Sequence, residues 1–140
     1  LRTSWVFSAH GQNFVRTMLR LAKTCDELDV VVDQTGGPTP ADAIASTLLA
    51  LIAALQEGAK GGTYHYAGAP FVSWAGFARE TFAKAGHMVT VRDIPSEAYP
   101  TPALRPRDTR MDCGRLSRDF GIEPPSWSAG LDRVLKELAA

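Results

Sequence analysis

Three side chains in the sequence have the chemistry and the surroundings of ligand-binding residues: Trp5, Gln34 and Arg105. The indole of Trp5 can stack on a sugar or a base, although its place in the apolar stretch LRTSWVF favours a core tryptophan in a buried strand. Gln34 begins QTGGPT, a flexible turn before a helix that can bind an anion or a hydroxyl group. Simple turn and cap chemistry explains the same residues equally well.

Arg105 lies with Arg107 in a proline-rich stretch, IPSEAYPTPALRPRDTRMD (residues 94–112). Two guanidinium groups can hold a diphosphate through paired hydrogen bonds. Exposed arginines are more often only solvated, so both interpretations stay open. Loops of this length are uncommon in compact domains unless they bind a ligand or wrap a partner.

The sequence contains no complete catalytic apparatus that we recognise. A short-chain reductase uses a tyrosine with a lysine four residues later, and none of Tyr64, Tyr66 and Tyr99 has one. The segment from Gly58 to Gly61 follows a helical pattern and precedes a strand, which is the wrong order for a dinucleotide fingerprint and indicates a helix end. Serine-hydrolase, zinc-protease and phosphate-loop motifs are absent as well.

Length and charge restrict the class of protein further. The 140 residues are enough for one domain with a real core, and 15 basic residues balance 15 acidic ones. We therefore expect no binding to nucleic acid and no polybasic membrane anchor. The apolar run Ala43–Leu55 is too short to span a bilayer and is predicted to be a core helix.

The cysteines and histidines are too scattered for a structural metal site. Cys25 and Cys113 lie far apart and match no metal-ligand spacing, so no metal ligand is predicted. The two thiols can form one disulfide, but a single pair in so apolar a chain is more typical of reduced cysteines in the cytoplasm.

Short strands alternate with helices along the chain, which indicates an α/β fold. Strands are predicted at residues 1–7, 29–33, 63–66 and 88–92, and helices at 13–23, 40–56, 73–86, 114–120 and 127–138. The first strand has large or β-branched side chains on both faces, as a strand buried in a sheet would, and is the only one that looks central. Asn13, Thr39 and Ser73 are predicted helix caps. The pattern is that of the second half of an α/β protein.

The ordered stretches LRTSWVF, GQNFVRTMLRLA, VVDQTGGPTPAD, GTYHYAG, SWAGFARE and YPTPALRPRDTRMD carry a family resemblance over nearly all 140 residues. The chain resembles the C-terminal portion of the dTDP-4-dehydrorhamnose reductases, which belong to the extended short-chain dehydrogenase/reductase superfamily. That family reduces the 4-keto group of dTDP-4-dehydro-L-rhamnose with NADPH or NADH, the last step in making dTDP-L-rhamnose for bacterial surface polysaccharides.

The resemblance implies an α/β fold of the extended Rossmann type, consisting of a late sheet strand and a small substrate-binding lobe. Residues 1–140 would be the substrate-binding C-terminal portion, and residues 1–25 within them the end of the Rossmann sheet and its following helix. The N-terminal dinucleotide-binding half, with the catalytic tyrosine and lysine, is expected to be missing, so the fragment alone would be inactive. NADPH or NADH would be bound mainly by that half, and the family leaves a role for Mg open.

By the same resemblance, Trp5 falls on the substrate-contacting tryptophan of the family, and Ser4 would lie near the nicotinamide. Gln34 and Arg105 would border the nucleotide-sugar cleft, while no residue of this chain falls on a catalytic position. The implied partners are a dTDP-sugar and a second copy in a homodimer, in the cytoplasm, with no nucleic acid and no membrane.

Two alternatives stay open. One is a non-catalytic regulatory or binding module of the same superfamily, like the regulatory subunit of methionine adenosyltransferase. The other is a nucleotide-sugar epimerase or dehydratase. In each case the first strand and the apolar helix stripes are expected to be partly uncovered in this chain.

Overall fold

Six short strands form three two-stranded sheets in the computed structural model, which describes residues 1–99, 101–103 and 105–140. Two pairs are parallel and one is antiparallel: β1 (Val6–Phe7) with β4 (Thr39–Pro40), β2 (Glu27–Val31) with β6 (Thr90–Ile94), and β3 (Thr35–Gly36) against β5 (Val72–Ser73). The parallel pairs join segments far apart in the chain, as helical crossovers require. The predicted α/β class is confirmed.

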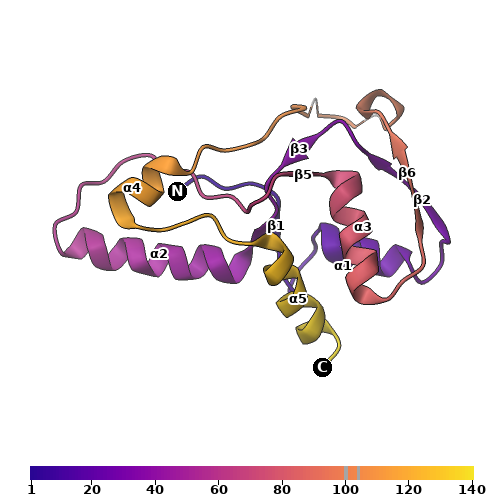
Figure 1. Cartoon of the computed structure of the whole chain (residues 1–140), viewed down its shortest axis with the longest axis horizontal. Coiled ribbons are helices and arrows are strands. Elements are labelled where there is room, and N and C mark those ends of the chain that lie inside the picture. The colour runs from indigo at the N-terminus through magenta and orange to yellow at the C-terminus, as the bar shows by residue number, and fades with distance from the viewer. Residues whose placement is uncertain (100, 104) are drawn as a thin grey trace.

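Five α-helices connect and cover these strands in the described part of the chain (Figure 1). They are α1 (Phe14–Leu21), α2 (Ala41–Gln56), α3 (Trp74–Ala85), α4 (Gly114–Phe120) and α5 (Trp127–Leu138), with a 3-10 turn, η1 (Ser96–Ala98). Asn13 and Ser73 cap α1 and α3 as predicted, because each side chain accepts a hydrogen bond from the backbone N–H three residues later. Gly86 ends α3 in the left-handed conformation.

The prediction of a seven-residue buried strand at the start of the chain is wrong. Only Val6–Phe7 forms a strand, and Arg2 makes an isolated bridge to His65. The interruption is at Trp5, whose φ of 48° is left-handed and cannot continue an extended strand. Phe7 is buried, whereas Leu1 and Val6 are 41% and 46% exposed, so this segment is partly uncovered as expected.

Thr39 is also not a helix cap. Pro40 occupies the cap position of α2 without a side-chain hydrogen bond. The hydroxyl of Thr39 is fully buried, donates to the carbonyl oxygen of Gly37 at 3.0 Å and accepts from the N–H of Gly68 at 3.2 Å. Thr39 therefore binds two loops together instead of capping the helix.

The remaining strands shift slightly from their predicted positions. The second predicted strand begins and ends two residues earlier, as β2, and the fourth moves two residues later, as β6. Their five-residue parallel register runs from Glu27 opposite Thr90 to Val31 opposite Ile94. The stretch 63–66 forms only the isolated bridge at His65.

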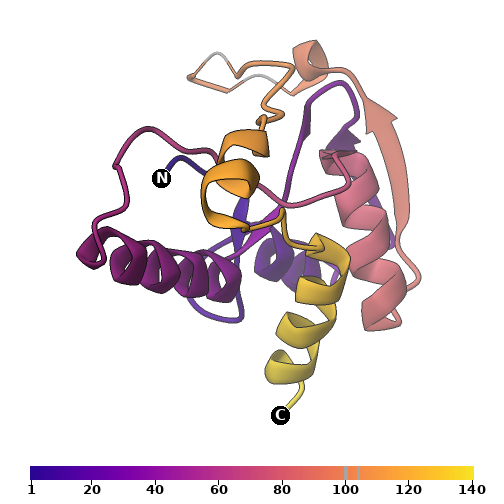
Figure 2. The same ribbon diagram turned by 60° about the vertical axis from the view of Figure 1, so that its left-hand side comes forward.

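Buried side chains gather in three clusters that lie in two parts of the molecule. Helices α1 and α5 pack on α3, and the side chains between them include the fully buried Phe77 and Leu131. The third cluster lies between α2 and α4 and contains Leu116 and Tyr64. Figure 2 shows α4 above α2 on one side, and α3 with β6 on the other.

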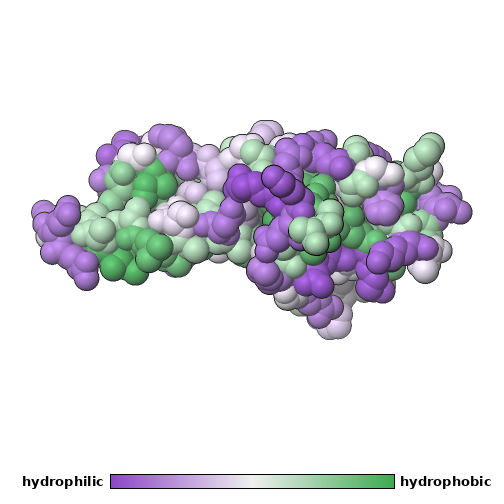
Figure 3. Space-filling view, turned by 90° about the horizontal axis from the view of Figure 1, so that it is seen from below, coloured by the Kyte–Doolittle hydropathy of each residue, from purple (hydrophilic) through white to green (hydrophobic). Residues whose placement is uncertain are grey.

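The apolar run that forms α2 is a helix but not a core helix, because only Thr47 and Leu51 on it are buried. Leu49 is 69% exposed and Ile52 is 52% exposed, and Leu48 and Leu55 are also exposed. Figure 3 shows apolar side chains gathered on the α2 end of the molecule. No helix within the described residues is apolar over a length that would cross a bilayer.

Candidate functional site

Trp5 lies in an aromatic stack and outside the buried core. Its ring is parallel to that of Trp74, with centroids 3.5 Å apart and planes 7° apart. The residue is half-buried, and none of the three described clusters of buried residues includes it. The half-exposed indole at a turn is compatible with the ligand-stacking role that the sequence left open.

Gly36 brings the predicted turn into contact with Trp5. A Cβ at Gly36 would lie 2.6 Å from Cε2 of Trp5 and 2.5 Å from Oγ1 of Thr109, closer than real Cβ contacts allow. The antiparallel pairing of β3 with β5 explains the neighbourhood, because Gly36 is opposite Val72, two residues before Trp74. Only glycine allows the indole to approach this turn so closely.

Ser4 and the backbone of Trp5 fasten the first segment to the same turn. The hydroxyl of Ser4 donates to the carbonyl oxygen of Gly37 at 3.2 Å. The carbonyl oxygen of Trp5 accepts from the N–H of Thr39 at 3.1 Å. Ser4 is therefore next to Trp5 and Gly37, and its hydroxyl group donates its hydrogen bond to another residue of the chain.

Gln34 lies at the other end of the turn, where it contacts η1. Its side-chain amide donates to the hydroxyl of Ser96 at 3.0 Å. That hydroxyl in turn donates to Oδ1 of Asp33 at 2.7 Å, and the N–H of Ser96 donates to the same oxygen at 2.9 Å. The hydrogen bond from the Ser96 hydroxyl is the main reason that the pKa of Asp33 falls below its ordinary value.

The late loop runs beside this turn and is held by backbone hydrogen bonds. Thr35 donates its N–H to the carbonyl oxygen of Arg107 at 2.8 Å and accepts from the N–H of Thr109 at 2.9 Å. Arg105 is exposed, two residues before Arg107. The structure thus brings the Arg105 segment to the turn that carries Gln34, although the side chains of Trp5, Gln34 and Arg105 share no contact among the described interactions.

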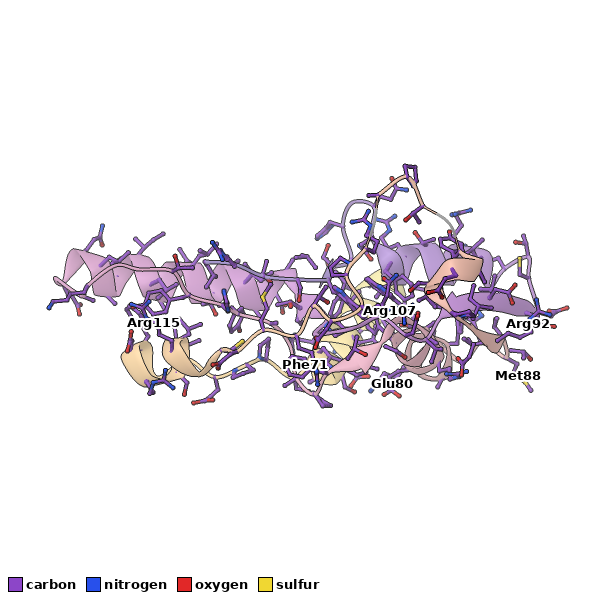
Figure 4. The ribbon with its side chains drawn as sticks, turned by 90° about the horizontal axis from the view of Figure 1, so that it is seen from above. Phe71, Glu80, Met88, Arg92, Arg107 and Arg115 are labelled. Atoms are coloured by element: carbon purple, nitrogen blue, oxygen red, sulfur yellow. The ribbon has the colours of Figure 1, made fainter. Side chains whose placement is uncertain are left out.

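Arg107 is engaged in ion pairs, which argues against a free clamp of two arginines. Its guanidinium contacts Glu97 and lies 3.7 Å from Oδ2 of Asp33. Figure 4 shows Arg107 over the middle of the molecule, between the α4 end and the β2–β6 end. Of the two loop arginines, Arg105 is the one without an ion pair among the described contacts.

Sequence reasoning missed two residues of this site, Trp74 and Thr109. The position of Trp74 fits the apolar spacing of α3, so the sequence pattern indicates only a core-facing residue there. Thr109 had no distinguishing signal, yet its hydroxyl donates to the carbonyl oxygen of Thr35 at 3.0 Å. Their positions depend on long-range pairing that a single sequence does not specify.

Two described cavities do not include Trp5 in their lining. The larger, of about 1110 Å³, is an open groove between α1 and the C-terminal halves of α3 and α5, and its lining includes the cationic side chains of Arg16, Arg20 and Lys136. The smaller, of about 310 Å³, adjoins Cys113 and Phe71. We place the candidate site at Trp5, because its stacked aromatic surface and anchored turn have a specific geometry, whereas the larger groove is mostly open to solvent.

Metal-ligating residues do not gather at the site. Within residues 1–99, 101–103 and 105–140, no three side chains of the histidine, cysteine, aspartate or glutamate type lie close enough to share a metal ion. Cys25 and Cys113 are both free thiols, as the sequence indicated.

Comparison with known proteins gives a family for the whole chain. The family model described as RmlD substrate binding domain matches residues 1–140. The chain is 43% identical to the dTDP-4-dehydrorhamnose reductase of Sinorhizobium fredii over 142 residues, which cover 96% of the chain and 48% of that protein. The chain thus spans about half the length of the curated relatives it matches.

Solved structures of similar proteins have the same fold. A dTDP-4-dehydrorhamnose reductase of Clostridium acetobutylicum superposes with a TM-score of 0.92 at 34% identity, over 99% of this chain and 48% of that one. A Bacillus anthracis dTDP-4-dehydrorhamnose reductase in complex with NADP gives a TM-score of 0.82 at 35% identity, over 97% of this chain and 46% of that one.

Proposed function

The chain belongs to the RmlD substrate binding domain family, and from this premise we propose that it forms the nucleotide-sugar-binding part of an NAD(P)H-dependent dTDP-4-dehydrorhamnose reductase. The complete enzyme would reduce the 4-keto group of dTDP-4-dehydro-L-rhamnose to give dTDP-L-rhamnose. One observation carries the proposal: the Trp5 indole is held flat on Trp74 at the Gly36 turn, outside the described core clusters.

The residues of the chain have distinct parts in this proposal. Trp5 would pack an exposed part of its indole against the sugar or the base. Ser4 and Gln34 fix the two ends of the turn through their hydrogen bonds, so the surface is ordered before a ligand arrives. Arg105, exposed on the adjoining loop, would approach the diphosphate with its guanidinium group.

The nicotinamide cofactor, NADPH or NADH, would supply the hydride. The residues of this chain do not themselves fit a dinucleotide site, because the sequence has no glycine fingerprint between a strand and a helix and no Tyr-x-x-x-Lys pair. We propose Ser4 only as a neighbour of the nicotinamide. We accordingly expect no NADPH oxidation by the 140-residue chain alone, and we assign no step to magnesium.

A chimera tests this proposal. The chain would replace the matching residues of the Sinorhizobium fredii relative, and NADPH oxidation would be followed with dTDP-4-dehydro-L-rhamnose. We expect activity in the chimera and a clear loss with Trp5→Ala. The Met88→Ala variant is the matched control, because this side chain is 98% exposed and lies two residues before β6, away from the turn. A folded chimera without activity would contradict the proposal.

The remaining parts of the proposal rest on the resemblance alone. They are the dTDP-sugar as partner, a homodimeric assembly of the complete enzyme and a cytoplasmic location. A regulatory module of the methionine adenosyltransferase type would leave a folded chimera inactive. An epimerase or dehydratase would convert a nucleotide sugar without net oxidation of NADPH.

A further inference from the structure

The backbone of Trp5 has a strained conformation, which interactions with the surrounding residues must stabilise. Its φ of 48° is the only positive value at a non-glycine residue among the described positions. A left-handed conformation is unfavourable for an ordinary L-residue, because Cβ crowds the carbonyl oxygen. The backbone hydrogen bond to Thr39 and the contacts of the indole must hold it in place.

The contact with Trp74 is an unusual one for two aromatic rings. Isolated pairs prefer offset or edge-to-face arrangements, because stacked quadrupoles repel when the rings overlap directly. Here the centroids are 3.5 Å apart and the planes 7° apart, so the rings overlap almost face to face. The surrounding structure therefore imposes this geometry, and both rings must be held firmly.

Trp74 is anchored from behind by the aromatic core. Its ring contacts that of Phe14, with centroids 4.6 Å apart, and Phe14 stacks on Phe77 at 5.4 Å. Phe77 is fully buried and makes an edge contact with Trp127. At the backbone, Ser73 caps α3 directly before Trp74. A continuous column of aromatic rings thus connects Trp5 to the interior.

Gly36 forms a second boundary for the indole of Trp5. With Trp74 on one ring face and the Gly36 turn at the Cε2–Nε1 edge, the plane of Trp5 is fixed on two sides. We propose that Trp74 is a positioning residue for nucleotide-sugar binding, acting through Trp5 and not through its own contact with the ligand. The inference rests on the proposed function of the Trp5 surface.

Aromatic and aliphatic replacements of Trp74 separate this role from bulk packing. Trp74→Phe keeps a flat ring beside Trp5, and we expect its affinity for dTDP-L-rhamnose to stay within about threefold of the unaltered chain. Trp74→Leu removes the flat surface, and we expect affinity to fall about tenfold, in line with the strength of an aromatic pair. In a Trp5→Leu background, Trp74→Leu should have no further effect.

Phe77→Leu is the matched control. It alters the same aromatic column, and its larger burial predicts a loss of stability at least as great as that of Trp74→Leu. It does not touch Trp5 or Trp74 among the described aromatic contacts and acts on them only through Phe14, so affinity for dTDP-L-rhamnose should fall much less than in Trp74→Leu. If Phe77→Leu loses as much affinity as Trp74→Leu, then Trp74 contributes only general packing, and the inference is overturned.

A second readout does not depend on ligand binding. In the chain labelled with 5-fluorotryptophan, the fluorine resonance of Trp5 is assigned by its absence from Trp5→Phe. Trp74→Leu should move it towards the solvent-exposed position and increase its solvent isotope shift, whereas Trp74→Phe should restore it. An unchanged Trp5 resonance in Trp74→Leu would overturn the positioning role. If the unaltered chain fails to bind dTDP-L-rhamnose, the proposed function fails, while this resonance still decides the positioning role.

Discussion

Gly36→Ala is the sharpest probe of the packing at the site. The added methyl group would meet Cε2 and Nε1 of Trp5 at 2.6 and 2.8 Å, and Oγ1 of Thr109 at 2.5 Å. Because φ of Gly36 is not left-handed, alanine is acceptable to the backbone, and any cost comes from these contacts. The indole must move away from the turn to admit the methyl group.

Overpacking of this kind costs about 1–3 kcal/mol. Gly61→Ala is the control, because nothing lies within 4 Å of the position its Cβ would take and its φ is also not left-handed. A glycine replaced without strain changes stability by about 0.4–1 kcal/mol in the favourable direction. We therefore expect Gly36→Ala to lower the free energy of unfolding and Gly61→Ala to raise it.

Urea unfolding measures both variants, and titration with dTDP-L-rhamnose measures the effect on the site. Combining Gly36→Ala with Trp5→Leu should recover part of the lost stability, because the shorter side chain leaves space at the turn. The contact with Thr109 remains, so recovery should be incomplete. If Gly36→Ala unfolds at the same urea concentration as Gly61→Ala, the packing of Trp5 on the turn is not as described.

Three further predictions concern other parts of the chain. Hydrogen bonds from Arg110 lower the pKa of Asp108 to about 2, so Asp108→Asn should lower the stability of the chain at neutral pH. In acid titrations, this difference in stability should disappear as the pH falls from 3.8 to about 2. Burial raises the pKa of the Cys113 thiol, so a thiol reagent should modify the half-buried Cys25 first and Cys113 mainly after unfolding. Leu49→Glu should reduce self-association in sedimentation experiments, because Leu49 is the most exposed large apolar residue of α2. Unchanged association would contradict this.

The local parts of the fold could be predicted from the sequence. Asn13 and Ser73 cap their helices and Gly86 ends α3, because caps depend on residues only three positions apart. The apolar pattern also identified every α-helix of the described chain. It did not reveal that α2 is largely uncovered, because hydropathy indicates burial without specifying what provides it.

The geometry of the site could not be predicted from local sequence patterns, because it depends on contacts between residues far apart in the chain. Trp5 has a left-handed backbone, which a tryptophan rarely adopts and which no sequence pattern indicates. Its contact with Trp74 results from the pairing of β3 with β5, two strands of two residues each. Ser4, Trp5 and Gln34 lie at one turn, and the exposed Arg105 lies on the loop beside it, while their roles in ligand binding stay predictions.

The central claim is that Trp5 and its turn form a surface for a nucleotide-linked sugar. Calorimetric titration of dTDP-L-rhamnose into the 140-residue chain and its Trp5→Ala variant tests this most directly. We predict measurable binding to the unaltered chain and an affinity at least about tenfold weaker in the variant, since one aromatic stacking partner is lost. Equal binding by the two chains, or no binding by either, would contradict the claim.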